Sequence, residues 1–126
     1  MRTPTTRRDE RVLLQPGSSI VRFADPREGG KITIGRLTTV SASGLAFVVE
    51  GEATQFPTTT LVDSITLRIG TCMITGEVVV RNTRRAGKGK VEVGCLFYPA
   101  VDDEERWMTL LAGIDFGLKL AKESAA

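Results

Sequence analysis

The residues of this chain that could do chemistry are, first, arginines near its start. Arg7, Arg8 and Arg11 stand close together, with Asp9 and Glu10 between them. Guanidinium groups pair with phosphate and carboxylate oxygens and lie flat against planar rings, so a cluster of them suits a small anionic ligand. The simpler alternative is a solvated N-terminal tail whose acids neutralise its own arginines.

A second polar run, TVSASG at residues 39–44, ends a stretch with strand-like alternation. Thr39 and Ser41 offer hydroxyl groups, and Gly44 lets a backbone approach closely or take a positive φ. An ordinary turn between two strands has the same composition. Each run is therefore weak evidence for a binding site when taken alone.

The elements that must position these runs are predicted to be strands. Apolar residues alternate with polar ones, as at Ile65, Leu67 and Ile69, which is the period-two pattern of a strand with one buried face. Turn-forming residues bound each such segment. The predicted strands cover residues 15–23, 31–40, 45–49, 65–69, 74–80 and 91–97.

Two irregular places are expected in this pattern. Ile32 and Ile34 are even-numbered whereas Leu37 is odd, so the register is predicted to slip at Gly35–Arg36 through a β-bulge. Bulges bend strands, which favours a curved sheet. The polar, glycine-containing residues 82–90 are predicted to form a long hairpin connection.

After Pro99 the apolar period changes from two to about 3.6, which predicts a helix over residues 102–120. Asp102 with Glu105 three residues later resembles a capping box, and the acidic cluster 102–105 suits a helix N-terminus. This interpretation is preferred to a metal or catalytic role for the acids. The apolar stripe comprises Trp107, Leu110, Leu111, Ile114 and Leu118.

Composition indicates one globular domain over residues 1–126, with 41% hydrophobic and 25% charged residues. No run approaches the ~20 apolar residues of a membrane-spanning helix, and no apolar stretch resembles a secretory signal. We therefore expect a cytoplasmic protein without membrane insertion. Cys72 and Cys95 lack metal-ligand spacing and are interpreted as small buried hydrophobes.

Several function classes are disfavoured by the composition. The chain has no histidine, which removes the commonest general base and metal ligand, so we expect no enzyme activity, no metal and no cofactor. The net charge of +2 is too small to indicate bulk DNA or RNA binding. Local basic clusters, at the N-terminus and at residues 84–90, suit a small anion better than a long polyanion.

Taken together, the motifs resemble those of the PilZ domain family, bacterial receptors for cyclic di-GMP. RRDER at 7–11 precedes the barrel strands, TVSASG at 39–44 forms the second half of the family's nucleotide motif, and GEVVVR at 76–81 and VGCLF at 93–97 look like later family strands. The resemblance runs from about Arg7 to Pro99. It implies an all-β fold, a six-stranded antiparallel β-barrel over residues 12–99 with a C-terminal α-helix, preceded by a flexible arm over residues 1–11.

The resemblance also implies the ligand and its contacts. Cyclic di-GMP is expected to meet Arg7, Arg8 and Arg11 of the arm, which would order as it folds over the ligand, and the second-motif residues Thr39, Ser41 and Gly44. Thr39 departs from the family pattern, which has Asp or Asn there. A threonine hydroxyl accepts one hydrogen bond and lacks the reach and charge of a carboxylate.

The function implied is a cyclic di-GMP receptor that changes its conformation or its binding of a downstream protein partner. The alternative is a PilZ-like protein-interaction module with weak or no nucleotide binding. A small barrel that binds single-stranded nucleic acid ranks last, because the few aromatic residues lie at expected core positions and leave no stacking platform.

Overall fold

The computed structural model of the chain describes residues 12–14 and 19–113. The β-strands in these ranges are β1 (Val12–Leu13), β2 (Ser19–Asp25), β3 (Lys31–Val40), β4 (Gly44–Glu50), β5 (Leu61–Ile69), β6 (Cys72–Gly87) and β7 (Lys90–Pro99). Short 3₁₀ turns are η2 (Pro26–Glu28), η3 (Ala53–Gln55) and η4 (Val101–Asp103). Residues 104–113 are α-helical. The order of elements, strands first and helix last, agrees with the sequence pattern.

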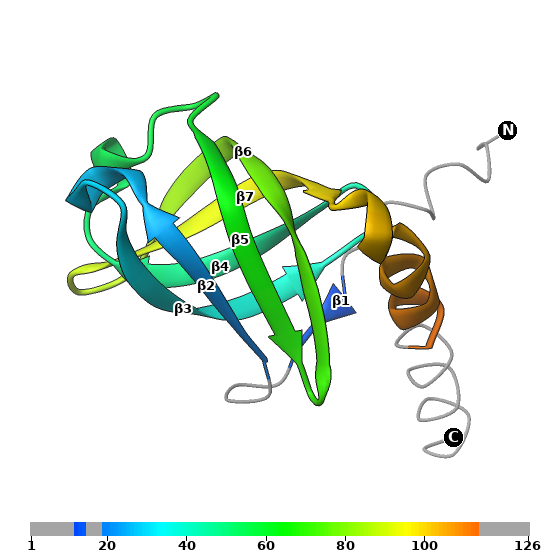
Figure 1. Ribbon diagram of the computed structural model, residues 1–126. Coiled ribbons are helices and arrows are strands. Elements are labelled where there is room, and N and C mark those ends of the chain that lie inside the picture. Colours follow the sequence, from blue (N-terminus) through cyan, green and yellow to red (C-terminus); the bar gives the residue numbers. More distant parts are fainter. Residues whose placement is uncertain (1–11, 15–18, 114–126) are drawn as a thin grey trace, which may run out of the picture.

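The strands form a closed barrel (Figure 1). Hydrogen-bonded neighbours run in the order β3, β2, β5, β6, β7, β4, and an additional β3–β4 pairing closes the ring. Every pairing is antiparallel. The short β1 pairs with Thr39 and Val40 at the end of β3, beyond the residues of β3 that pair with β2. The predicted six-stranded antiparallel barrel is therefore confirmed, together with its C-terminal helix.

Alternating side chains of the six barrel strands fill the interior. Phe23 and Phe47 meet across it with ring centroids 5.3 Å apart. The helix covers one end of the barrel, where Trp107 is buried and contacts Phe97 in an edge arrangement at 4.9 Å. Leu110 and Leu111 pack against the same core as expected. Other fully buried members include Val21, Leu37, Ile65, Leu67, Ile74 and Val78.

The predicted bulge at Gly35–Arg36 is wrong. The β2–β3 register runs without a shift from Asp25 and Lys31 to Ile20 and Arg36. The irregularity lies further on, between Leu37 and Thr39 in the pairing with β4. Gly35 occupies the interior position before Leu37, because a Cβ there would lie 2.6 Å from a Val49 methyl group. Glycine has no apolar side chain to mark an interior position, so the sequence pattern indicated a register slip that does not occur there.

The long hairpin connection predicted over residues 82–90 is also wrong. Strand β6 continues to Gly87 and β7 starts at Lys90, which leaves a tight turn. Arg84 lies opposite Glu92, and Arg84 Nε is 2.5 Å from Glu92 Oε1. The pairing of β6 with β7 thus extends through a segment whose polar composition indicated a loop.

The helix start differs from the predicted capping box. The residue before η4 is Ala100, which makes no side-chain cap. Asp103, rather than Asp102, is engaged: its Oδ2 accepts hydrogen bonds of 2.8 Å from both N–H and Oγ1–H of Thr75 on β6. These bonds hold the pKa of the Asp103 carboxyl below its usual value. The acid therefore joins the helix start to the barrel, and the predicted helix residues 114–120 lie outside the described residues.

Neither cysteine is in a disulfide. Cys95 is buried as predicted, whereas Cys72 at the start of β6 is half-buried. Within the part of the chain that the structure describes, no helix is long and apolar enough to cross a membrane.

Candidate ligand-binding site

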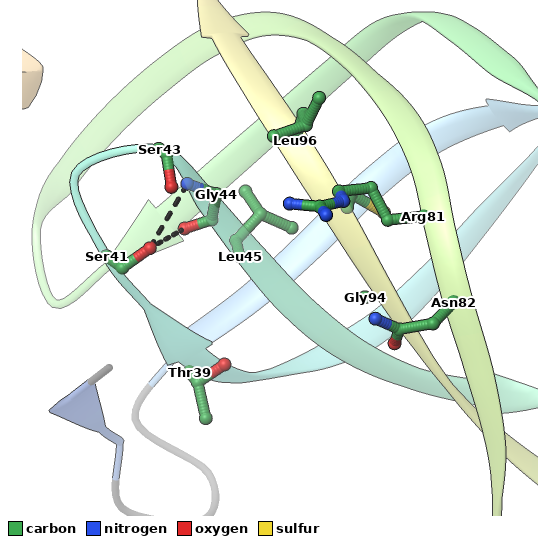
Figure 2. A pocket seen from close by; sticks show the side chains of 10 residues that line it. Thr39, Ser41, Ser43, Gly44, Leu45, Arg81, Asn82, Gly94 and Leu96 are labelled. Atoms are coloured by element: carbon green, nitrogen blue, oxygen red, sulfur yellow. Dashed lines mark hydrogen bonds between the residues drawn. The ribbon is translucent and has the colours of Figure 1, made fainter. Parts of the chain in front are cut away.

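The turn between β3 and β4 is held by its own polar groups. Ser41 N–H donates to the carbonyl of Gly44 at 2.8 Å, and Gly44 N–H donates to Ser41 Oγ at 3.2 Å. The Ser41 hydroxyl returns a bond to the Gly44 carbonyl at 3.3 Å (Figure 2). Phe97 N–H also donates to the Ser43 carbonyl at 3.1 Å, which fixes the turn to β7. The second motif therefore has a defined shape before any ligand arrives.

Gly44 is required here by close packing of backbones. A Cβ on residue 44 would collide with the carbonyl oxygen of Cys95 on β7. That atom belongs to a paired strand and cannot move aside cheaply. Gly44 thus allows β4 to approach β7 closely, and this approach brings the turn beside the β7 backbone.

A pocket of about 160 Å³ opens beside this turn, on the outside of the barrel. It brings together three residues that the sequence predicted as ligand contacts, Thr39, Ser41 and Gly44 (Figure 2). The remaining lining residues are Ser43, Leu45, Arg81, Asn82, Gly94, Cys95 and Leu96. The predicted second motif therefore lines a real concavity at the junction of β3, β4, β6 and β7.

Three of the lining residues, Thr39, Gly94 and Asn82, belong to one row that crosses four strands. Thr39 is opposite Ala46, Ala46 is opposite Gly94, and Gly94 is opposite Asn82. Opposed residues of antiparallel strands point to the same face, so all four belong to the outer surface. Gly94 has no side chain to fill the pocket, and the polar side chains of Thr39 and Asn82 lie at the two ends of the row.

The hydroxyl of Thr39 is buried and unpaired. Thr39 is only 8% exposed, and its Oγ1 has no hydrogen-bond partner among the described residues. The neighbouring hydroxyl of Thr38, in contrast, donates to the Ala46 carbonyl at 3.1 Å and lies 3.0 Å from Glu92 Oε2. Buried polar groups are normally satisfied, so an orphaned hydroxyl at a pocket wall is a place where a ligand atom could bond.

Positive charge reaches the pocket through Arg81. The β6–β7 register shifts between Val80 and Asn82, so Arg81 is the extra residue at this irregularity. Its exposed guanidinium lines the pocket (Figure 2). Arg36 on β3 is also exposed, but it does not line the pocket.

Asn82 was missed by sequence reasoning. It lay in the polar run interpreted as a loop, and its place in the pocket depends on the β6–β7 pairing opposite Gly94. The only local signal is the glycine in VGCLF at 93–97, which marks a close approach on β7.

Arg7, Arg8 and Arg11, the predicted contacts of the arm, lie outside the described residues. What the structure does place is the segment that follows them. Val12 is opposite Val40, and Leu13 is opposite Thr39, a pocket residue. The chain therefore enters the barrel directly beside the strand end that carries the second motif.

The polar groups lining the pocket are hydroxyls, an amide, a guanidinium and backbone atoms. The Cys95 thiol belongs to the core, and burial raises its pKa to about 12, which leaves it protonated and unreactive near neutral pH. No group of three or more cysteine or carboxylate side chains in the described ranges could hold a metal ion. The lining is suited to hydrogen-bonding a polar or anionic ligand.

A closed six-stranded barrel with this outer pocket and a helix after its last strand is the architecture of a PilZ-like domain. The match to MrkH of K. pneumonia in complex with c-di-GMP has a TM-score of 0.75 and 20% identity over 91% of this chain and 55% of that chain. Apo MrkH matches with a TM-score of 0.74 and 18% identity, covering 96% and 55% of the two chains. The PilZ domain of YcgR from Escherichia coli with c-di-GMP matches with a TM-score of 0.69 and 14% identity, covering 94% and 96%.

These likenesses show the fold, and they confirm the barrel architecture that the motifs implied. The chain spans about half the length of the MrkH chains and nearly all of the YcgR domain. No family model matches the sequence. No curated protein matches it either.

Proposed function

We propose that this chain is a PilZ domain that acts as a receptor for cyclic di-GMP. The observation that carries the proposal is the pre-shaped turn from Ser41 to Gly44, which lines a pocket beside the unpaired hydroxyl of Thr39. Support comes from similar structures of MrkH and the YcgR PilZ domain, each described with c-di-GMP.

The ligand's chemistry fits this set of groups. Cyclic di-GMP presents two phosphodiester charges, purine faces, and guanine edges with O6 and N7 acceptors. Arg81 can pair with a phosphate, bond bidentately to O6 and N7, or lie against a base. The unpaired hydroxyl of Thr39, and the hydroxyl oxygen of Ser41, which can accept a further bond, complete a mixed donor and acceptor surface.

The pocket holds part of this ligand, and the N-terminal arm is assigned the rest. A volume of about 160 Å³ is below the range of about 300–1,000 Å³ that encloses a drug-sized molecule. Arg7, Arg8 and Arg11 precede β1, which pairs beside Thr39, so the arm is tethered within reach of the pocket. In the proposed complex these arginines close over the exposed side of the dinucleotide, and the arm orders on binding.

The proposed role assigns a part to each region of the chain. Residues 1–126 are proposed to form a single domain, with 1–11 as the ligand-capturing arm. Binding rather than catalysis is proposed, in the cytoplasm, with a change in conformation or in the binding of a downstream protein as the output. The alternative, a PilZ-like protein-interaction module with weak or no nucleotide binding, has the same barrel, so a titration with the ligand distinguishes the two.

The test is an NMR and calorimetric titration of the full chain with cyclic di-GMP, with GTP and single-stranded DNA as competitors. Saturable binding with amide shifts at residues 7–11 and 39–44 is expected. Arg11→Ala should abolish binding, while Arg85→Ala, which removes an arginine outside the pocket lining, should leave it unchanged.

Two results would contradict the proposal. Unchanged amide shifts at millimolar cyclic di-GMP would favour the alternative hypothesis, the interaction module. Equal losses in Arg11→Ala and Arg85→Ala would mean that the ligand responds only to overall charge. Melting curves of both variants, which should match the wild type, exclude unfolding as the cause.

A further inference from the structure

The outer surface of β2, β3 and β5 carries exposed apolar and arginine side chains that the proposed ligand site does not use. In the ring of strands, β2 and β5 lie across the barrel from β4 and β7, which build much of the pocket. Figure 1 shows β2 and β5 on the near side of the barrel. Any role of this surface is therefore separate from the pocket.

The strand registers place these side chains in adjoining rows. One row runs Arg36, Ile20, Arg68 and Met73 from β3 to β6. The next contains Ile34 opposite Arg22, and a third contains Ile32. We call this surface the arginine–isoleucine face and define it by Arg22, Ile32, Ile34, Arg36, Arg68 and Met73.

The apolar members are unusually exposed for their type. Ile32, Ile34 and Met73 are 50%, 62% and 53% exposed. Scattered apolar residues are ordinary on a protein surface, but adjoining β-branched side chains on one strand form a small contiguous patch. Arginines lie opposite some of these apolar residues on the neighbouring strands, so the patch is part apolar and part charged.

The arginines of the face are exposed and carry one sign of charge. The side chains of Arg22, Arg36 and Arg68 make no hydrogen bond or ion pair with any other described residue. On β2, β5 and β6, the other outward positions of these rows are Ile20, Ala24, Thr66 and Thr75, none of them acidic. Toward β4, the row of Arg36 continues to Val48 and then to Glu92, whose carboxylate is engaged by Thr38 and Arg84. Glu28 and Glu50 lie near Ile32 and Ile34 at the end of β3. At the β6 border, the Asp103 carboxylate is already held by Thr75 and Arg106.

This combination differs from the basic hairpin on the same molecule. There, Arg84 is paired with Glu92, and lysines predominate at the tip. Protein interfaces are enriched in arginine, methionine and aromatic residues and depleted in lysine and acids at their centres. The arginine–isoleucine face has that composition, and its unbalanced charge favours a partner that supplies carboxylates.

We propose that the arginine–isoleucine face docks a partner protein through an acidic segment that also carries apolar side chains. Along β3, Ile32, Ile34 and Arg36 project outward at every second residue. An extended segment lying along this strand would match them with two apolar residues and then an acid at the same spacing. The inference does not rest on cyclic di-GMP binding, and its test is made without ligand.

The probe is the synthetic peptide Val-Ser-Val-Ser-Glu-Ser-Glu, titrated into the isotope-labelled full chain and followed by NMR. Saturable amide shifts at residues 20–24, 32–36 and 66–68 are expected, weakened several-fold in 0.5 M salt because exposed charges are then screened. The control peptide, with lysine in place of both glutamates, should not bind.

Matched variants locate the contact. Arg36→Glu should weaken peptide binding at least tenfold, whereas Arg85→Glu, the same charge change on the hairpin, should have little effect. Ile34→Thr keeps a β-branched residue and should weaken binding through the apolar half. The wild-type spectrum elsewhere shows that each variant is folded.

Several outcomes would overturn the proposal. These are an absence of saturable shifts, shifts centred on residues 84–90, and equal effects of Arg36→Glu and Arg85→Glu. Shifts at the face produced by anionic phosphatidylserine vesicles or by duplex DNA, with none from the peptide, would assign the surface to a membrane or a nucleic acid instead.

Discussion

The Oδ1 atom of Asn82 occupies the space that a Cβ on Gly94 would need. The two residues are directly opposed on β6 and β7, and an ideal Cβ built on Gly94 lies 2.5 Å from that oxygen. The amide of Asn82 therefore lies across the β7 backbone at the pocket floor. This relationship makes residue 94 a sensitive point for the shape of the site.

Gly94→Ala should change ligand binding with little change in stability. The added methyl displaces the end of an exposed, flexible side chain, which is a cheap adjustment. We expect the affinity for cyclic di-GMP to fall about tenfold, roughly 1.4 kcal/mol, because Asn82 is pushed from its position and the floor is raised. Calorimetry gives the affinity, and an unshifted melting curve shows that the barrel is intact.

Gly44→Ala provides the contrasting case in the same pocket. Its methyl would meet the carbonyl oxygen of Cys95, a backbone atom that is held in a ladder. Overpacking of this kind costs about 1–3 kcal/mol. We expect a clear drop in melting temperature here and none for Gly94→Ala. Similar stability losses in both variants would contradict this account of the two glycines.

Thr39→Val should separate stability from binding. Because Thr39 Oγ1 is buried without a partner among the described residues, replacing the hydroxyl by a methyl group removes a desolvated polar atom. The unliganded domain should become more stable by about 1 kcal/mol. Cyclic di-GMP binding should weaken if that hydroxyl meets the ligand. Chemical denaturation and calorimetry measure the two effects, and a destabilised variant would show that the hydroxyl has a partner in solution.

Asp25, the last residue of β2, carries a buried carboxylate that is held by several hydrogen bonds. Its buried carboxylate accepts bonds from Arg27 Nη2 at 2.7 Å, Arg27 N–H at 2.9 Å and Thr33 Oγ1 at 2.8 Å. Arg27 in turn donates to the Glu50 carbonyl at 2.8 Å and lies over the Phe56 ring. Burial alone would raise the pKa of Asp25, but these bonds and the Arg27 charge outweigh it and hold the pKa below 3.8.

The stability that Asp25 contributes should therefore be lost in acid. A carboxyl whose pKa is lower in the folded state stabilises the protein above its unfolded pKa, near 3.8, and loses that effect as the pH falls through the folded value. Asp25→Ala should cost about 3–5 kcal/mol at pH 7, because it leaves Arg27 uncompensated. Denaturation at pH 7 and pH 2.5 should show this gap narrowing in acid, and a constant gap would contradict the assignment.

The two cysteines should differ in reactivity. Burial raises the pKa of Cys95 to about 12, so the thiol stays protonated at pH 8. Iodoacetamide should modify half-buried Cys72 in the native protein and reach Cys95 only after denaturation. Mass spectrometry of the labelled peptides reports both sites. Equal labelling under native conditions would mean that β7 opens readily beside the pocket.

Much of the fold was predictable from local pattern. Alternation in segments such as 65–69 and 91–97 survives in the structure, because burying one face of a strand requires a period of two in the sequence. The change of period after Pro99 likewise predicted the helix that carries Trp107. The errors occurred where that signal is missing: Gly35 is an interior residue without a side chain, and residues 82–87 continue strand β6 with mostly polar residues and no large apolar one.

The sequence alone was sufficient to identify the second motif. Ser41 and Gly44 form a local turn, and its hydrogen bonds join residues that are three positions apart. Only the tertiary structure decided that Thr39 keeps an unpaired hydroxyl, that Arg81 and not Arg36 reaches the pocket, and that Asn82 stands opposite Gly94. These facts depend on the registers between strands distant in sequence. Register follows from packing the whole barrel, so no single segment encodes it.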